Sequence, residues 1–242
     1  MKNLSVIVPC FNFDKLIAKN INRIIKNLSK KNYDYEIIVA NDGSKDNTTS
    51  EIKKLIKNNK NIRLINFRNN RGKSYVIKYS LRKTMFNNIL LIDCDLPYFE
   101  YFNNVISKLN KKNDLVIINR RSKKSSLKNK KLTYYQWFRG KLGDIIGYII
   151  NFLLKLEIEG NDTQAGLKAF KKIHNFNKIK FYSEKWFLDL ELIKLYKDFN
   201  KKIFCIPVKY ELPKESNISF FSLKNFFVLY EFIKILIILK IK

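Results

Sequence analysis

Short apolar runs alternate with segments of helical periodicity along the first half of the chain, and this alternation constrains the fold more than any other feature. The apolar runs are short, which suits strands buried on both faces. We expect strands at residues 4–8, 35–40, 62–67, 89–92 and 114–118, and helices at residues 16–30, 46–58 and 72–86. Strands joined by helices of this length need crossover connections. The pattern therefore predicts an α/β fold with a mostly parallel sheet flanked by helices.

Polar clusters follow three of these apolar runs, at the point where each predicted strand ends. The clusters are residues 9–12, 41–44 and 93–95. In open parallel sheets, ligands bind at the carboxyl ends of the strands, near the switch in strand order. The coincidence of the three clusters predicts a ligand site at this edge of the sheet.

The third cluster, Asp93-Cys94-Asp95, pairs two carboxylates. Side chains two residues apart in an extended chain point to the same side, so Asp93 and Asp95 can converge on one point. Like charges held that close raise each other's pKa unless a cation joins them. The expected cation is Mg²⁺ or Mn²⁺, which keeps several non-protein oxygen ligands and bridges them to phosphates. Such a tripeptide also occurs in solvated turns, and the neighbouring clusters are what favour the metal site.

The composition excludes several other kinds of site. The chain of 242 residues has one histidine, His174, and three cysteines, Cys10, Cys94 and Cys205, without a CxxC pair. These counts argue against a disulfide framework, a zinc site and histidine-based nucleophilic catalysis. The chain enters its first apolar run at Leu4 without the apolar region or cleavage site of a signal peptide, so we expect a cytoplasmic protein.

The formal net charge of +27 has three interpretations: nucleic acid, an anionic membrane surface, or a background bias toward Lys and Asn. Lysines are spread through nearly every polar segment, as a background bias would leave them. The densest basic run is residues 120–131. Recognised nucleic-acid-binding motifs are absent from the sequence, and the aromatic residues lie in apolar runs, so no specific nucleic-acid partner is expected.

The second half of the chain departs from regular alternation. Residues 134–156 predict one long helix, whose apolar part is short and interrupted by glycine, which argues against a membrane span. Further strands are expected at residues 167–170 and 203–208, with a helix at 186–196. Residues 226–241 are strongly apolar but contain Glu231, Lys234 and Lys240, as in a helix lying at a membrane interface. We therefore expect a domain at 1–215 followed by a membrane-associating amphipathic helix at 216–242.

The ordered motifs VIVPCFN, ANDGSKDNT, NNRGKS and LLIDCDLP resemble those of the family 2 glycosyltransferases, which have the GT-A fold. In the second half, residues 162–170, 184–192 and 206–208 are similar to the polyprenyl-phosphate glycosyltransferases, and among them most similar to dolichyl-phosphate glucosyltransferases. The resemblance covers residues 4–208. Each motif alone is weak, but the ordered set is specific.

The resemblance implies roles for individual residues. Contacts to the nucleotide are implied for Pro9, Asn12, Asp14, Asp42 and Lys73, and contacts to the metal and diphosphate for Asp93 and Asp95. Phosphate contacts are implied for Arg120 or Arg121 with Arg139, and the acceptor side for Asp162, Gln164 and Gly166. The residues expected to take part in the reaction itself are Asp93, Asp95, Arg139 and Asp162.

Three positions depart from the family pattern. Asn41 replaces the first Asp of the usual DDGS, Phe13 replaces a Glu for which Asp14 is a substitute, and Pro97 lies where a further metal-supporting residue often occurs. These departures leave open a glycosyltransferase-like protein without catalysis. A basic nucleic-acid-binding protein is a further alternative.

The implied reaction is inverting transfer of a hexose from a nucleotide sugar to a polyprenyl phosphate, at the cytoplasmic face of a membrane. UDP-glucose is the favoured donor and GDP-mannose the next. A lipid monophosphate has its second pKa at about 6, so it is already a nucleophilic dianion at neutral pH and needs no strong base. If the acceptor is instead a saccharide hydroxyl, as in surface polysaccharide synthesis, a base is needed, and Asp162 is the candidate. For Asp189 and Glu191, a site role and simple bonding to neighbouring Arg or Lys remain equally open.

Overall fold

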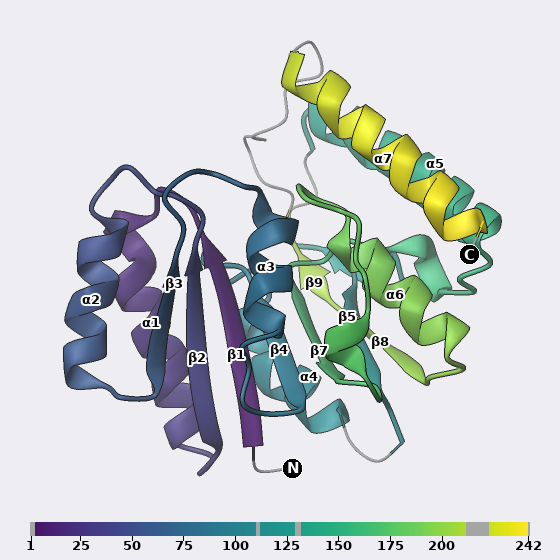
Figure 1. Ribbon diagram of the computed structural model, residues 1–242. Coiled ribbons are helices and arrows are strands. Elements are labelled where there is room, and N and C mark those ends of the chain that lie inside the picture. Colours follow the sequence, from purple (N-terminus) through teal and green to yellow (C-terminus); the bar gives the residue numbers. More distant parts are fainter. Residues whose placement is uncertain (1–2, 110–111, 129–131, 212–222, 242) are drawn as a thin grey trace.

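The computed structural model describes residues 3–109, 112–128, 132–211 and 223–241, with the side chains of 139 and 223–226 excepted. Its centre is a seven-stranded sheet in the order β3-β2-β1-β4-β7-β5-β8, with helices on both faces (Figure 1). The strands are β1 (Asn3–Cys10), β2 (Asp34–Asn41), β3 (Ile62–Asn66), β4 (Asn88–Ile92), β5 (Leu115–Asn119), β7 (Leu167–Lys171) and β8 (Ile203–Pro207). The predicted α/β class and mostly parallel sheet are confirmed.

The helices also follow the predicted segments. They are α1 (Asp14–Ser29), α2 (Thr48–Asn58), α3 (Lys73–Leu81), α4 (Phe102–Lys108), α5 (Tyr134–Leu154), α6 (Leu188–Asp198) and α7 (Leu223–Ile241). Short 3-10 turns lie at Phe99–Tyr101, Glu159–Asn161 and Phe176–Lys178, and a small second sheet pairs β6 (Ser126–Leu127) with β9 (Lys209–Tyr210). The helix expected at 72–86 ends early, at Leu81. The seven-residue α4 was not predicted because so short a segment has little periodicity to read.

Each face of the sheet is buried, as the apolar runs predict. Alternate residues of β1 point to opposite sides, so that Leu4, Val6 and Val8 pack with α1 and α4, whereas Ile7 packs with α3 and α6. The α1 stripe consists of Ile17, Ile21, Ile24 and Leu28, all fully buried. This three- and four-residue spacing is what places one face of the helix on the sheet.

One strand runs against the others. β7 is antiparallel to both of its neighbours, β4 and β5, and Leu167 at its start pairs with Ile92 at the end of β4. The polar turn before β7 therefore lies at the same edge of the sheet as the Asp93–Asp95 cluster. The Asp93 N–H donates to the Gly166 carbonyl at 3.1 Å. The reversed strand thus brings the two polar segments together.

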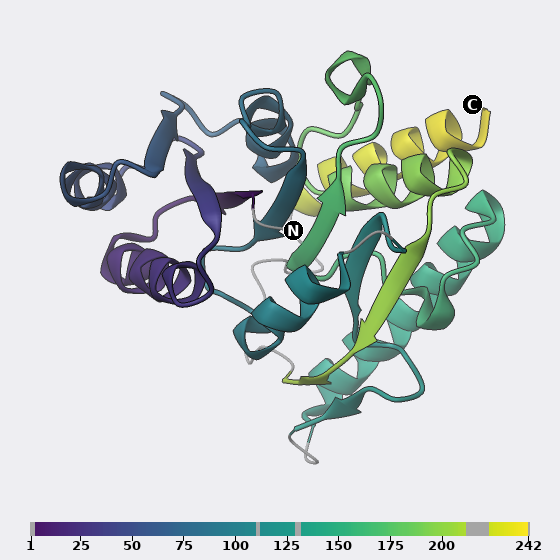
Figure 2. The same ribbon diagram turned by 90° about the horizontal axis from the view of Figure 1, so that it is seen from below.

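α5 and α7 contact each other along one side of the molecule, and α7 also contacts α6 (Figure 1, Figure 2). Ile235 and Leu239 anchor α7 in the core, together with Ile150 and Leu154 of α5. Among the helices of the described residues, none is both long and apolar enough to cross a membrane. The domain boundary expected at 215/216 lies outside the described residues.

Candidate functional site

The loops that follow β1 and β2 are joined by reciprocal hydrogen bonds. The Asn12 N–H donates to the Ser44 hydroxyl at 2.8 Å, and the Asn12 side-chain oxygen accepts the Lys45 N–H at 2.9 Å. Asn12 has a φ of 49°, a left-handed conformation that asparagine adopts more readily than most residues. Pro9 lies buried in β1 beside Ala40 of β2. The first two predicted polar clusters therefore form one continuous edge.

Asn41, one of the three departures, is fully engaged inside the protein. Its amide nitrogen donates to Thr49 at 2.9 Å and to the side-chain oxygen of Asn66 at 2.7 Å. Its oxygen accepts the Ser44 N–H at 3.3 Å and the Ser44 hydroxyl. Because the residue is fully buried, an amide with two donors suits this position. Asn41 thus shapes the loop instead of facing a ligand.

Asp42 holds the loop that leads into α3. Its two carboxylate oxygens accept the N–H groups of Arg71, at 2.6 Å, and Gly72, at 2.9 Å. Burial raises the pKa of Asp42, although these two hydrogen bonds and the charge of Lys185 act to lower it. Gly72 has a φ of 107°, which only glycine adopts without strain. The carboxylate therefore fixes a tight turn directly beside the ends of β1 and β2.

Lys73 lies among the acidic groups of the predicted metal site. Its Nζ atom lies 2.5 Å from Asp93 Oδ1. Burial alone would lower the pKa of Lys73, but the carboxylates of Asp93 and Asp189 raise it above its ordinary value, with a smaller effect from Asp95. Burial and the neighbouring charge of Asp93 raise the pKa of Asp95. The structure thus brings together the two predicted carboxylates and one predicted cation.

The carboxylate pair has the chemistry of a divalent-metal site. Asp95 is exposed, and no ion pair to it is found in the described part of the chain. Gly166 packs closely against Asp93, since a Cβ atom there would lie only 2.6 Å from Asp93 Oδ2, so a residue without a side chain is needed at this position. Hard carboxylate oxygens suit Mg²⁺ or Mn²⁺. Within the described residues no group of three or more His, Cys, Asp or Glu side chains forms a metal cluster. Asp93 and Asp95 are thus residues at this edge that could hold such a cation.

Asp189 and Glu191 have different partners. Asp189 forms an ion pair with Lys168 of β7 at 2.7 Å, and Lys168 is almost fully buried. Glu191 accepts the N–H groups of Tyr182, at 2.7 Å, and Ser183, at 2.6 Å. Bonding to a neighbouring Lys therefore holds for Asp189, whereas Glu191 binds backbone. Lys168 was not singled out from the sequence, because a lysine in a five-residue strand gives no sign of pointing inward.

Arg120 and Asp162, two of the predicted site residues, form a bidentate ion pair. The Arg120 side chain donates to both carboxylate oxygens, at 2.8 and 2.7 Å, and the Arg120 N–H donates a third bond at 2.8 Å. Burial would raise the pKa of Asp162, but the hydrogen bonds and charge of Arg120 lower it below its ordinary value. Arg120 also interacts with Tyr98, in the turn after Asp95. The pair thus adjoins the Asp93–Asp95 loop.

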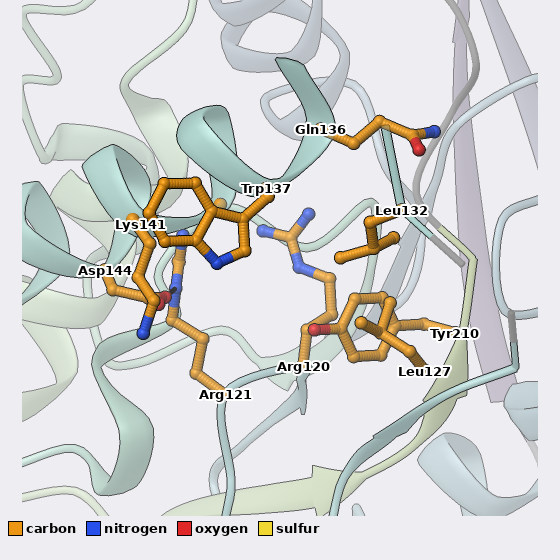
Figure 3. A pocket seen from close by; sticks show the side chains of 10 residues that line it. Arg120, Arg121, Leu127, Leu132, Gln136, Trp137, Lys141, Asp144 and Tyr210 are labelled. Atoms are coloured by element: carbon orange, nitrogen blue, oxygen red, sulfur yellow. Dashed lines mark hydrogen bonds and ion pairs between the residues drawn. The ribbon is translucent and has the colours of Figure 1, made fainter. Parts of the chain in front are cut away.

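A cavity of about 210 Å³ opens beside this ion pair (Figure 3). Its walls come from the loop after β5, from β6 and β9, and from the first half of α5. Its basic and polar residues are Arg120, Arg121, Gln136, Lys141 and Asp144, and its apolar and aromatic residues are Leu127, Leu132, Trp137 and Tyr210. Arg121 donates to Asp144 at 2.6 Å. The cavity therefore combines guanidinium groups with apolar walls.

The remaining predicted residues are Asp14, Gln164 and Arg139, and of these the Gln164 N–H donates to Asp162 at 3.4 Å. Asp14 is the first residue of α1, and its N–H donates to Asp46 at 3.1 Å. Gln164 is exposed in the turn before β7. Arg139 belongs to α5, but its side chain lies outside the described residues.

Comparisons with known proteins agree with this architecture. The model of the family described as glycosyl transferase family 2 matches residues 5–182. Dolichyl-phosphate beta-glucosyltransferase of Dictyostelium discoideum is 31% identical over 233 residues, which are 90% of this chain and 69% of that protein.

Two solved structures show the same fold at low identity. One is mannosyltransferase PcManGT from Pyrobaculum calidifontis in complex with GDP-Man and Mn²⁺, with a TM-score of 0.56, 19% identity, and coverage of 88% of this chain and 58% of that chain. The other is glucosyl-3-phosphoglycerate synthase from Mycobacterium tuberculosis with Mn²⁺, UDP and glucosyl-3-phosphoglycerate, with a TM-score of 0.62, 16% identity, and coverage of 96% and 79%. Because the family model matches most of the chain and runs through the site loops just described, the chain belongs to glycosyl transferase family 2.

Proposed function

We propose that the chain transfers a hexose from a nucleotide sugar to a polyprenyl phosphate at a membrane surface. The observation that carries the proposal is the link between the carboxylate pair and a cavity: Arg120, which lines a cavity of guanidinium and apolar groups, interacts with Tyr98 in the turn that follows Asp93 and Asp95. The names of the relatives support the same reading, since the chain is similar to dolichyl-phosphate beta-glucosyltransferases. UDP-glucose is our first choice of donor and GDP-mannose the second.

The donor binds, in this proposal, at the edge formed by the ends of β1, β2 and β4. Asn12 and Asp42 shape the nucleotide end of this edge, and Asp93 with Asp95 would hold Mg²⁺ or Mn²⁺. The metal supplies positive charge that stabilises the diphosphate leaving group. Lys73 adds a fixed cation at the same place. Two solved structures of the same fold contain Mn²⁺, which supports a divalent cation here.

The acceptor phosphate binds in the cavity of Figure 3, where Arg121 and Lys141 supply positive charge and Trp137 and Leu132 can contact the first isoprene units. A phosphate oxygen attacks the anomeric carbon, the bond from that carbon to the diphosphate oxygen breaks, and the configuration inverts. At neutral pH the phosphate is already largely a dianion. The lowered pKa of Asp162 makes this residue a weak base, and its two oxygens are taken by Arg120. This geometry favours a phosphate acceptor over a hydroxyl.

α5 and α7 form the membrane-facing surface in this proposal. Ile145, Tyr148 and Phe152 of α5 are exposed at helical spacing, with Phe152 73% exposed, and α7 exposes Tyr230 and Ile237. Exposed lysines on the same two helices, such as Lys141 and Lys240, suit an anionic lipid surface. The proposal places this contact on the cytoplasmic face of the membrane.

Calorimetric titration with UDP-glucose and GDP-mannose tests the donor, each with Mn²⁺ and with excess chelator. We expect one donor to bind in a metal-dependent way, and radiolabelled hexose from that donor to appear on a polyprenyl phosphate in detergent. Transfer to a saccharide instead of the lipid would overturn the acceptor assignment. Failure of both donors to bind would overturn the donor assignment.

A further inference from the structure

Four successive backbone N–H groups ahead of α6 donate to carboxylates from two different helices. The N–H groups of Tyr182 and Ser183 donate to Glu191 of α6. Those of Glu184 and Lys185 donate to one oxygen of Glu231 in α7, at 2.6 and 2.8 Å. Segment 182–185 is therefore held from one side by α6 and α7 together. Hydrogen bonds to ionised carboxylates are about twice as strong as neutral ones, so this attachment is firm.

The other side of the same segment holds the start of α3. The Glu184 carbonyl accepts the Tyr75 N–H at 2.9 Å, and the Lys185 carbonyl accepts the Ser74 N–H at 3.1 Å. N–H groups in the first turn of a helix have no acceptor within that helix, and here the carbonyl groups of segment 182–185 accept them. Contact is close, because a Cβ atom at Gly72 would lie 2.5 Å from the Glu184 carbonyl oxygen. Movement of this segment would therefore displace the start of α3.

The start of α3 carries two groups of the donor site. The Gly72 N–H donates to Asp42, and Lys73 pairs with Asp93. A continuous series of hydrogen bonds and ion pairs thus runs from Glu231 through segment 182–185 and Gly72–Lys73 to Asp42 and Asp93. Among the residues of α7 whose side chains the structure describes, Glu231 is the one that belongs to this series.

Burial of the Glu231 carboxylate costs free energy that the attachment of α7 alone does not require. One of its oxygens takes three donors, since the Ser183 hydroxyl also lies 3.0 Å from it. The other oxygen, Oε2, is buried without a hydrogen-bond partner in the described part of the structure. A buried oxygen without a partner costs free energy, and apolar contacts of Ile235 and Leu239 already anchor the helix. The presence of a carboxylate here is therefore better explained by its hydrogen bonds to segment 182–185 than by the anchoring of α7.

We propose that Glu231 is a positioning residue that makes nucleotide affinity depend on the placement of α7. The inference rests on the proposed function, because it assumes that the edge bearing Asp42, Lys73 and Asp93 binds the nucleotide. Through Glu231, the series of hydrogen bonds and ion pairs connects α7, which faces the membrane in that proposal, to the donor site. Packing of α7 in its observed position should then raise nucleotide affinity, and nucleotide binding should stabilise that packing by the same free energy, as linkage between two sites requires.

The test compares Glu231→Gln with Lys234→Gln, an exposed position on the same helix, in the full chain. Titration with UDP and with GDP, each with Mn²⁺, is made at a temperature where circular dichroism shows all three proteins folded. For the nucleotide that binds, we expect Glu231→Gln to raise Kd about tenfold and Lys234→Gln to leave Kd unchanged. A residue that only stabilises the fold would lower Tm without changing Kd, so an unchanged Kd in Glu231→Gln overturns the inference.

Hydrogen exchange supplies a second measurement that needs no variant. In the unchanged chain, nucleotide with Mn²⁺ should slow amide exchange in segment 182–185 and around Glu231, as well as at the donor site itself. Protection confined to the donor site overturns the inference and leaves the proposed function standing. If neither UDP nor GDP binds to the unchanged chain, the proposed function fails and this inference fails with it.

Discussion

Lys73 and Asp93 form a 2.5 Å ion pair between the first residue of α3 and the first residue after β4. The ammonium therefore occupies part of the space that a metal bound to Asp93 and Asp95 would fill. If Asp93 and Asp95 hold a divalent metal as proposed, Lys73 and that metal would compete for the Asp93 carboxylate, and both could offset the charge of a bound diphosphate.

The first prediction concerns this competition. Lys73→Gln should tighten binding of Mn²⁺ to the nucleotide-free protein by at least about fivefold, equal to ~1 kcal/mol, because a like charge is removed from the site. The same change should weaken binding of the nucleoside diphosphate. Calorimetry with Mn²⁺ alone and then with UDP measures both, with exposed Lys53→Gln as the control. Weaker Mn²⁺ binding in the variant would show that Lys73 supports the metal instead of competing with it.

Asp95→Ala should abolish metal-dependent nucleotide binding and leave the fold intact. Asp95 is exposed, so we expect the free energy of unfolding to change by no more than about 0.5 kcal/mol. Glu100→Gln, which removes another exposed carboxylate of the same loop region, is the control and should bind normally. Nucleotide affinity unchanged in Asp95→Ala would remove this residue from the site.

Asp162→Asn should destabilise the protein by about 3 kcal/mol at neutral pH, because it leaves the Arg120 guanidinium without its ionic partner. The pKa of Asp162 is lowered in the folded state, so its stabilising effect is present above the unfolded pKa of about 4 and is lost as pH falls through the folded value. Urea denaturation from pH 7 down to pH 3 should therefore show the difference between the two proteins shrinking. A difference that stays constant with pH would contradict this account.

Two glycines should respond to alanine in opposite directions. Gly72→Ala forces a side chain into a φ of 107° and into contact with the Glu184 carbonyl, so we expect a loss of about 2 kcal/mol or more and weaker nucleotide binding. Gly140→Ala, in α5, meets no atom within 4 Å and should stabilise the protein by about 0.5–1 kcal/mol. Thermal unfolding of both variants tests the pair. Equal effects would show that the close approach at Gly72 is not important.

Membrane contact is expected to depend on the exposed apolar faces of α5 and α7. The double variant Phe152→Ser with Ile237→Ser should lower partitioning onto vesicles containing anionic lipid by at least about tenfold, because each side chain contributes about 1.5–3 kcal/mol when buried. Met85→Ser is the control, since Met85 is equally exposed but lies outside both helices. Co-sedimentation with vesicles measures the effect. A similar loss for Met85→Ser would point to nonspecific adsorption.

The sequence predicted the strands of the seven-stranded sheet to within two residues, because each is a compact apolar run between polar turns, but it did not predict the two-residue strands β6 and β9. It also predicted that the polar ends of β1, β2 and β4 meet, since the ends of neighbouring parallel strands share one edge. The direction of β7 could not be foreseen, because the five residues LKAFK carry no information about strand direction. Direction depends instead on where the preceding turn lies relative to the sheet.

Contacts between segments far apart in the sequence also could not be predicted from it. Arg120 and Asp162 are 42 positions apart, and both had been placed near phosphates or acceptor without any sign that they bind each other. The sequence places Glu231 in a segment typical of a helix at a membrane interface, yet its carboxylate turns inward to segment 182–185. In each case a charged side chain that could have faced solvent found its partner only through the fold.

The reversed strand β7 also sets the order in which the protein can be completed during synthesis. A nascent chain that ends before residue 166 already contains β1 to β5 and the Asp93–Asp95 loop, but β4 and β5 still lack the strand that lies between them. Their facing edges are then unpaired, and such edges readily join other strands. The Asp93 N–H also lacks its hydrogen-bond acceptor, the Gly166 carbonyl, at this stage. The Asp93–Asp95 loop is thus finished only after about two thirds of the chain has emerged, so partly synthesised protein is prone to aggregate before this edge of the sheet is complete.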